Sequence, residues 1–232
     1  LSGKKGSGKS SFAYHLVNFF LSKDEELKYD LIKNKINSEN KSYKLLQNNS
    51  HPNFYLIDLL AEKKNIDVAQ IRGMISYTNK STFNNQDRFI MIDNVEYLNK
   101  NSINSLLKII EEPNENIYFI LIANSQKNIL PTLKSRCITF KIHFSFDNTV
   151  NICNQILNQN ILNELNYDLI NYYCTPGEII KLIQFAEEKQ INLRDHDNSS
   201  IISLIIENTY YKKNIFIKNL LINFIELFLL KR

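Results

Sequence analysis

Gly3-Lys4-Lys5-Gly6-Ser7-Gly8-Lys9-Ser10 matches the pattern G-x-x-x-x-G-K-[ST] at every fixed position. The glycines allow backbone N–H groups to turn inward around phosphate oxygens. The apolar run that follows has helical spacing, so the positive end of a helix would face the phosphates. This context argues against the alternative, a glycine-rich turn without function. We predict that a nucleotide phosphate is bound by Gly3, Gly6, Gly8, Lys9 and Ser10, with the Ser10 hydroxyl also a ligand of Mg²⁺.

The composition is that of an ordinary globular protein, with 44% hydrophobic and 22% charged residues in a chain of 232. The net charge of +4 permits contact with nucleic acid without arguing for it. The three cysteines are widely spaced and form no C-x-x-C pair, so we expect no zinc site and a reducing, cytoplasmic location. Charged and amide residues interrupt the apolar run 215–230, so we expect a buried or partner-facing helix there and no membrane span.

Apolar runs and helical spacings alternate over the first 143 residues. Strands are expected at 54–59, 88–93, 117–122 and 137–142, and helices after the loop, at 68–78, and around 103–110 before Pro113. This alternation predicts an α/β fold with a parallel sheet covered on both faces. Only Leu1 and Ser2 precede the loop and the first residue is not Met, so we expect a fragment with a truncated first strand and a missing C-terminal part.

Beyond residue 143 the pattern is helical. Helices are expected at 150–157, 162–173 and 177–188, with at least one more within 200–232. We therefore expect an α/β nucleotide-binding domain at 1–143, a three-helix lid at 144–192 and the start of a helical domain at 193–232.

Asp93 follows the best predicted strand, Phe89-Ile90-Met91-Ile92. In this position a carboxylate would hold the Mg²⁺ shell of a nucleotide, although an Asp at a strand end is also a common turn residue. The next residue is Asn94, whose amide can orient a water molecule but cannot accept its proton. Glu96 lies two positions further on and need not point the same way. We expect weak or absent ATP hydrolysis by the chain itself.

Asn124 follows the strand predicted at 117–122 and is a weak candidate for a sensor of the γ-phosphate. Residues 101–113 read N-S-I-N-S-L-L-K-I-I-E-E-P, and residues 130–137 read L-P-T-L-K-S-R-C. With the loop and Asp93, this ordered set resembles the clamp-loader branch of the AAA+ P-loop NTPase family over about residues 1–190. The resemblance implies that the third domain is a collar that holds an oligomeric ring together.

In that family the arginine of Ser-Arg-Cys is a finger that contacts the γ-phosphate held by a neighbouring subunit. The resemblance gives this catalytic role in trans to Arg136, and an always-charged forked guanidinium suits a phosphoryl group. An exposed arginine after a turn is the alternative.

Among clamp-loader subunits the chain resembles the delta-prime type of bacterial DNA polymerase III. Asn94 replaces the Glu of the hydrolysing subunits, Ile180 replaces the sensing Arg of their lid, and their zinc-binding cysteines are missing before Asp93. His51-Pro52-Asn53 is also similar to a stretch of delta-prime subunits.

The resemblance implies a stator in a five-membered ring with tau/gamma and delta subunits, which loads a sliding clamp onto primed DNA. ATP with Mg²⁺ is the expected cofactor. Two alternatives stay open. A tau/gamma-like motor would need Glu96 and Lys181 as substitutes for the missing groups, and a small-molecule kinase would need an arginine-rich lid.

Overall fold

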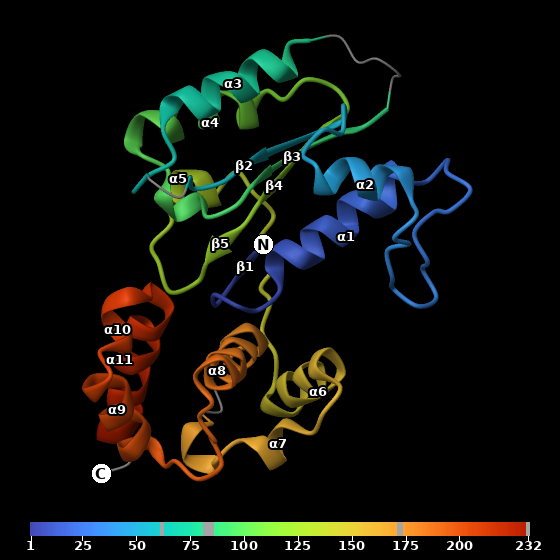
Figure 1. Cartoon of the computed structure of the whole chain (residues 1–232). Coiled ribbons are helices and arrows are strands. Elements are labelled where there is room, and N and C mark those ends of the chain that lie inside the picture. Colours follow the sequence, from blue (N-terminus) through green and yellow to red (C-terminus); the bar gives the residue numbers. More distant parts are fainter. Residues whose placement is uncertain (61–62, 81–85, 171–173, 231–232) are drawn as a thin grey trace. The chain divides into compact units, whose positions relative to one another are not determined.

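The computed structural model describes residues 1–60, 63–80, 86–170 and 174–230 (Figure 1). Its contacts divide the chain into two compact units, Leu1–His143 and Phe144–Arg232. The strands of the first unit are β1 (Ser2–Gly3), β2 (Phe54–Ile57), β3 (Arg88–Ile92), β4 (Ile117–Leu121) and β5 (Ala123–Asn124). Its helices are α1 (Lys9–Leu21), α2 (Lys41–Gln47), α3 (Val68–Thr78), η1 (Val95–Tyr97), α4 (Lys100–Glu111) and α5 (Pro131–Lys134).

The central sheet of the first unit has the order β2-β3-β4, and all its pairings are parallel. Side chains of β3 alternate between two cores, as the twofold period of a strand requires. Ile90 and Ile92 pack in a cluster with residues of α3 and α4, whereas Phe89 and Met91 pack in a cluster with residues of α1 and α2. Figure 1 shows these two helix pairs on opposite faces of the sheet. The predicted α/β class with a doubly covered parallel sheet is confirmed.

Strand β1 pairs with β5 in a second, two-stranded sheet. On its other side, the amide of Ser2 donates to the carbonyl of Phe140, and the amide of Ile142 donates to the carbonyl of Ser2. The predicted strand at 137–142 is wrong, because only Lys141 forms a bridge, with Ser2. Residues 137–141 instead line a cavity of about 780 Å³, together with residues of β4. A β1 of two residues offers them no longer edge to pair with.

The second unit is helical. Its elements are α6 (Phe146–Leu157), α7 (Ile161–Glu164), η2 (Tyr167–Leu169), α8 (Pro176–Lys189), α9 (Asn198–Glu207), α10 (Tyr210–Lys213) and α11 (Ile215–Leu230). The single helix predicted at 162–173 is wrong over its described part. Leu165 is extended, and the Asn166 side chain starts a new turn by accepting from the amide of Asp168. Residues 171–173 lie outside the described residues.

One apolar core serves the whole second unit. It contains Val150 of α6, Ile183 of α8, Ile205 of α9 and Leu220 of α11. The expected lid (144–192) and collar (193–232) thus contribute to the same cluster, and the boundary between them stays a prediction. No helix in the described part of the chain is long and apolar enough to cross a membrane.

Candidate nucleotide-binding site

The loop between β1 and α1 has the backbone that its glycines predict. Gly6 and Gly8 have φ values of 83° and 71°, in the left-handed region that favours glycine. Gly8 is also the N-cap of α1, so the helix begins where the loop ends. Gly3 is needed for space, because a Cβ there would lie 2.6 Å from the carbonyl oxygen of Ile142. The loop is therefore a tight turn that ends at the N-terminus of a 13-residue helix.

Lys9 lies inside this loop. Its Nζ donates to the carbonyl oxygens of Gly3 at 3.0 Å and Lys4 at 2.7 Å. Burial lowers the pKa of its ammonium, while the carboxylates of Asp93 and Glu96 act in the opposite direction. The ammonium thus lies near the loop carbonyls and within the field of two strand-end carboxylates, where it is able to turn toward a bound phosphate.

Ser10 and Asp93 join the first turn of α1 to the end of β3. The hydroxyl of Ser10 donates to Oδ2 of Asp93 at 2.5 Å. Burial raises the pKa of the Asp93 carboxyl, the Ser10 hydrogen bond opposes the rise, and the nearby Asp58 carboxylate adds to it. A hydroxyl and a carboxylate are hard oxygen ligands, so the pair fits Mg²⁺ bound together with a nucleotide. Within the described residues there is no group of three or more His, Cys, Asp or Glu side chains able to hold a metal by themselves.

Asp58 is a site residue that the sequence analysis missed. It follows β2 as Asp93 follows β3, and the parallel register pairs Ile57 with Ile92, so both carboxylates stand at the same edge of the sheet. Oδ1 of Asp58 accepts from the side-chain amide of Asn94 at 2.7 Å and from the amide of Leu59 at 2.6 Å. The signal was present in the sequence, because Phe54–Ile57 is an apolar run that ends in an Asp, as the run before Asp93 is.

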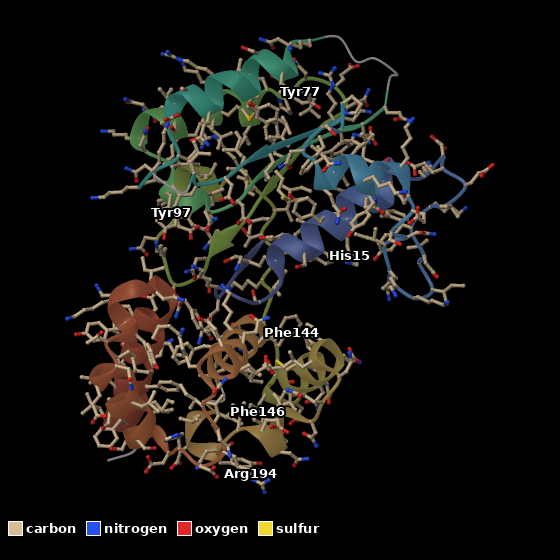
Figure 2. All side chains as sticks on the ribbon, viewed as in Figure 1. His15, Tyr77, Tyr97, Phe144, Phe146 and Arg194 are labelled. Atoms are coloured by element: carbon tan, nitrogen blue, oxygen red, sulfur yellow. The ribbon has the colours of Figure 1, made fainter. Side chains whose placement is uncertain are left out.

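The sensor candidate Asn124 lies beside Glu96. Its backbone amide donates to Oε2 of Glu96 at 3.2 Å, while its own side chain accepts from the amide of Gln126. The same two segments meet again where Nζ of Lys127 lies 3.7 Å from the centre of the Tyr97 ring (Tyr97 is labelled in Figure 2). The carboxylate of Glu96 is thus engaged with the backbone after β4, and the Asn124 side chain stabilises a local turn.

Arg136 lies elsewhere in the first unit. Its guanidinium pairs with Glu111 at the end of α4 and donates to the carbonyl of Thr132 in α5. The structure therefore brings together the loop, Ser10, Asp93, Asp58 and Asn94, while the contacts described for Arg136 are with other elements.

A comparison with protein families shows to which family the chain belongs. A family described as DNA polymerase III, delta subunit, matches residues 1–145. The chain belongs to this family. The resemblance to the clamp-loader AAA+ proteins is thereby confirmed.

Relatives in this family carry two subunit names. DNA polymerase III subunit delta' of Pseudomonas aeruginosa is 30% identical over 100 residues, which are 43% of this chain and 30% of the relative. Subunit delta' of Bacillus subtilis is 30% identical over 140 residues, 59% of this chain and 39% of the relative. Subunit gamma of Buchnera aphidicola subsp. Schizaphis graminum is 31% identical over 151 residues, 61% and 40% of the two chains. The chain thus spans 30% to 40% of the length of these relatives.

Two solved structures from Thermotoga maritima are also similar. A DNA polymerase III gamma subunit-related protein is 23% identical, with a TM-score of 0.39, over 45% of this chain and 34% of that protein. The RuvB Holliday junction branch migration motor is 12% identical, with a TM-score of 0.41, over 90% of this chain and 68% of that protein.

Proposed function

We propose that the chain is a delta-prime-type subunit of the DNA polymerase III clamp loader, which binds Mg-ATP, hydrolyses it weakly or not at all, and supplies Arg136 to a neighbouring ATP site. Its partners would be tau/gamma and delta subunits in a five-membered ring, and through the ring the sliding clamp and primed DNA. The relatives named delta' support this subunit type.

The observation that carries the proposal is the contact between Asn94 and Asp58. An efficient ATPase needs a carboxylate beside Asp93 that can take a proton from water. Asn94 stands there instead, and its amide is a hydrogen-bond donor to Asp58 at 2.7 Å. Losing a general base costs a factor of about 10²–10⁴ in rate, so the site would bind nucleotide and turn it over slowly.

The groups proposed to substitute for the missing base and sensor have other contacts. Glu96 accepts from the backbone of Asn124. In the second unit, Nζ of Lys181 lies 5.5 Å from the centre of the Phe216 ring. These contacts favour a binding role over a motor role.

Mg-ATP would be held by the loop, Lys9, Ser10 and Asp93. The helix N-terminus and Lys9 would orient the phosphates, and Ser10 and Asp93 would take positions around the ion. When bound, Mg²⁺ would neutralise phosphate charge. Asn94 would orient a nearby water by donating to it or accepting from it, without taking its proton.

A tau/gamma-like ATPase is the second candidate. Asp58 favours it, because this carboxylate stands one strand away from Asp93 at the same edge of the sheet. The gamma relative, which matches 61% of the chain, favours it as well.

The test uses the full-length protein, alone and in a reconstituted loader. We expect it to bind a fluorescent ATP analogue with Mg²⁺ but to show little turnover alone. Arg136→Ala should reduce the DNA-stimulated ATPase of the loader by about tenfold or more, because an arginine finger contributes much of the rate of phosphoryl transfer. Arg72→Ala is the matched control, since Arg72 is an exposed arginine on α3. Brisk turnover by the isolated protein that Lys9→Ala abolishes would favour the motor instead.

A further inference from the structure

The guanidinium of Arg136 is held along one side. Oε1 of Glu111 accepts from its Nε at 2.6 Å and also pairs with its Nη2. On the opposite side, the carbonyl oxygen of Thr132 accepts from Nη1 at 2.9 Å. Three nitrogens of one side chain are therefore fixed by two partners that lie 25 and four residues away in sequence.

These contacts leave the end of the fork open. A guanidinium carries five N–H donors in one plane, one on Nε and two on each terminal nitrogen. Glu111 takes the side formed by Nε and Nη2, and Thr132 takes one donor of Nη1. Within the described residues, one N–H on Nη1 and one on Nη2 have no contact and are available to a ligand. This pair is the arrangement that binds two oxygens of a phosphate.

Both partners of Arg136 are fixed to one core. Glu111 is the last residue of α4, in which Leu106 is fully buried. Thr132 belongs to α5, in which Leu133 is 2% exposed. Leu106 and Leu133 lie in the same apolar cluster as the strand residue Ile92. The orientation of the guanidinium is thus tied to the sheet that bears Asp93.

Stability does not account for Glu111. A carboxylate at the C-terminal end of a helix is disfavoured by the helix dipole. The ion pair is exposed, with 37% and 47% of the two side chains accessible, and exposed pairs contribute little to stability. The main effect of the ion pair is therefore to restrict the orientations that the Arg136 guanidinium can take.

We infer that Glu111 is a positioning residue for Arg136, holding one side of its guanidinium so that the two remaining N–H groups are available to a phosphate of a neighbouring subunit. The inference rests on the proposed function, because it gives Arg136 a γ-phosphate to contact. The carboxylate and the phosphate use different donors, so they support rather than compete with each other.

The test measures DNA-stimulated ATPase in the reconstituted loader as a function of ATP concentration. Glu111→Ala should lower kcat by about three- to tenfold with little change in KM, since a misplaced group costs rate more than ground-state binding. Glu111→Gln keeps an acceptor oxygen, so its kcat should fall less than that of Glu111→Ala. Glu112→Ala removes the same charge from the next residue, also exposed, and should behave as the unchanged chain.

A double-mutant cycle separates positioning from a general structural effect. In an Arg136→Ala background, Glu111→Ala should cause no further loss of kcat. A general structural defect would instead lower kcat below that of Arg136→Ala alone. Thermal unfolding of each variant shows whether it folds.

The outcomes distinguish the two claims. If Arg136→Ala leaves the loader ATPase unchanged, the proposed function fails and takes the inference with it. If Arg136→Ala is impaired while Glu111→Ala is unchanged or faster, the finger stands and the inference is wrong, a faster variant meaning that Glu111 restrains Arg136.

Discussion

The side-chain amide of Asn94 donates a 2.7 Å hydrogen bond to Oδ1 of Asp58, which joins the end of β3 to the end of β2. Asn94 is in the left-handed region, with φ 59°, a conformation that Asn tolerates better than most residues. The contact gives the Asp58 carboxylate a side-chain donor at the edge of the sheet that also bears Asp93.

Asn94→Asp should therefore destabilise the protein. The substitution removes the donor and adds a like charge next to Asp58, so we expect the free energy of unfolding to fall by about 1–2 kcal/mol at pH 7.5. Protonation of one carboxylate relieves the added repulsion, so the stability that the variant loses at high pH should be regained as pH falls toward 5. Urea unfolding at the two pH values measures this.

Asn99→Asp is the matched control for that prediction. Asn99 is the N-cap of α4 and accepts from the amide of Ser102, a position where Asp caps equally well and its charge suits the helix dipole. If Asn99→Asp lowered the free energy of unfolding as much as Asn94→Asp, our interpretation of the Asp58 contact would be contradicted.

Lys9→Ala should weaken binding of a fluorescent ATP analogue in the presence of Mg²⁺ by about tenfold or more, because it removes the charge that reaches the phosphates. Lys23→Ala, an exposed lysine after α1, removes the same charge and should bind as before. A small loss of stability in Lys9→Ala is also expected, since the carbonyls of Gly3 and Lys4 lose their donor. Equal affinity of both variants would rule out a phosphate-binding role for Lys9.

The two loop glycines should respond differently to substitution. Gly3→Ala places a Cβ 2.6 Å from a backbone oxygen, and we expect a loss of about 1–3 kcal/mol from overpacking. Gly8→Ala meets no atom within 4 Å, but its φ of +71° costs about 1–2 kcal/mol for an L-residue. Gly8→Asn should recover part of that loss, whereas Gly3→Asn should not. Denaturant midpoints of the four variants test this, and a rescue at Gly3 would contradict the packing argument.

His51 should make stability fall in acid. Burial lowers the pKa of its imidazole below the ordinary 6.5, with the nearby Glu25 acting in the opposite direction. The unfolded chain then binds a proton more readily than the folded chain, so the stability that the neutral ring contributes is present above pH 6.5 and is lost as pH falls through the folded pKa.

His51→Asn should reduce the slope of melting temperature against pH between 7.5 and 5.5. Asn keeps an acceptor for the amide of Asn53, to which Nδ1 of His51 is bonded at 3.1 Å. His143→Asn, at an exposed histidine, should leave the slope unchanged. A steep slope that survives in His51→Asn would assign the acid loss to other groups.

Local patterns in the sequence predicted most of the first unit. Helix α3 has the bounds that its periodicity indicated, and β2, β3 and β4 lie within the predicted apolar runs. The prediction failed where local side chains compete with a helix, as at Asn166, or where a strand needs a partner of sufficient length, as at 137–142.

The site was predictable to the extent that its motifs are local. The loop glycines, Lys9 and Ser10 follow from spacing alone, and Asp93 follows from the strand before it. The partners of these residues depend on tertiary structure. The Asn94 contact with Asp58 spans 36 residues and the Arg136 contact with Glu111 spans 25, so each needed the sheet register or the meeting of two helix ends.

The core of the second unit has a consequence for how this part of the chain unfolds. Buried apolar side chains of α6, α8, α9 and α11 form one cluster, so loss of any of these helices exposes surface on the others. Contiguous burial of this kind makes a segment open as one cooperative unit. In calorimetry, residues 144–230 should therefore give a single endotherm. Hydrogen exchange at the most protected amides of α8 and α11 should report the same opening free energy.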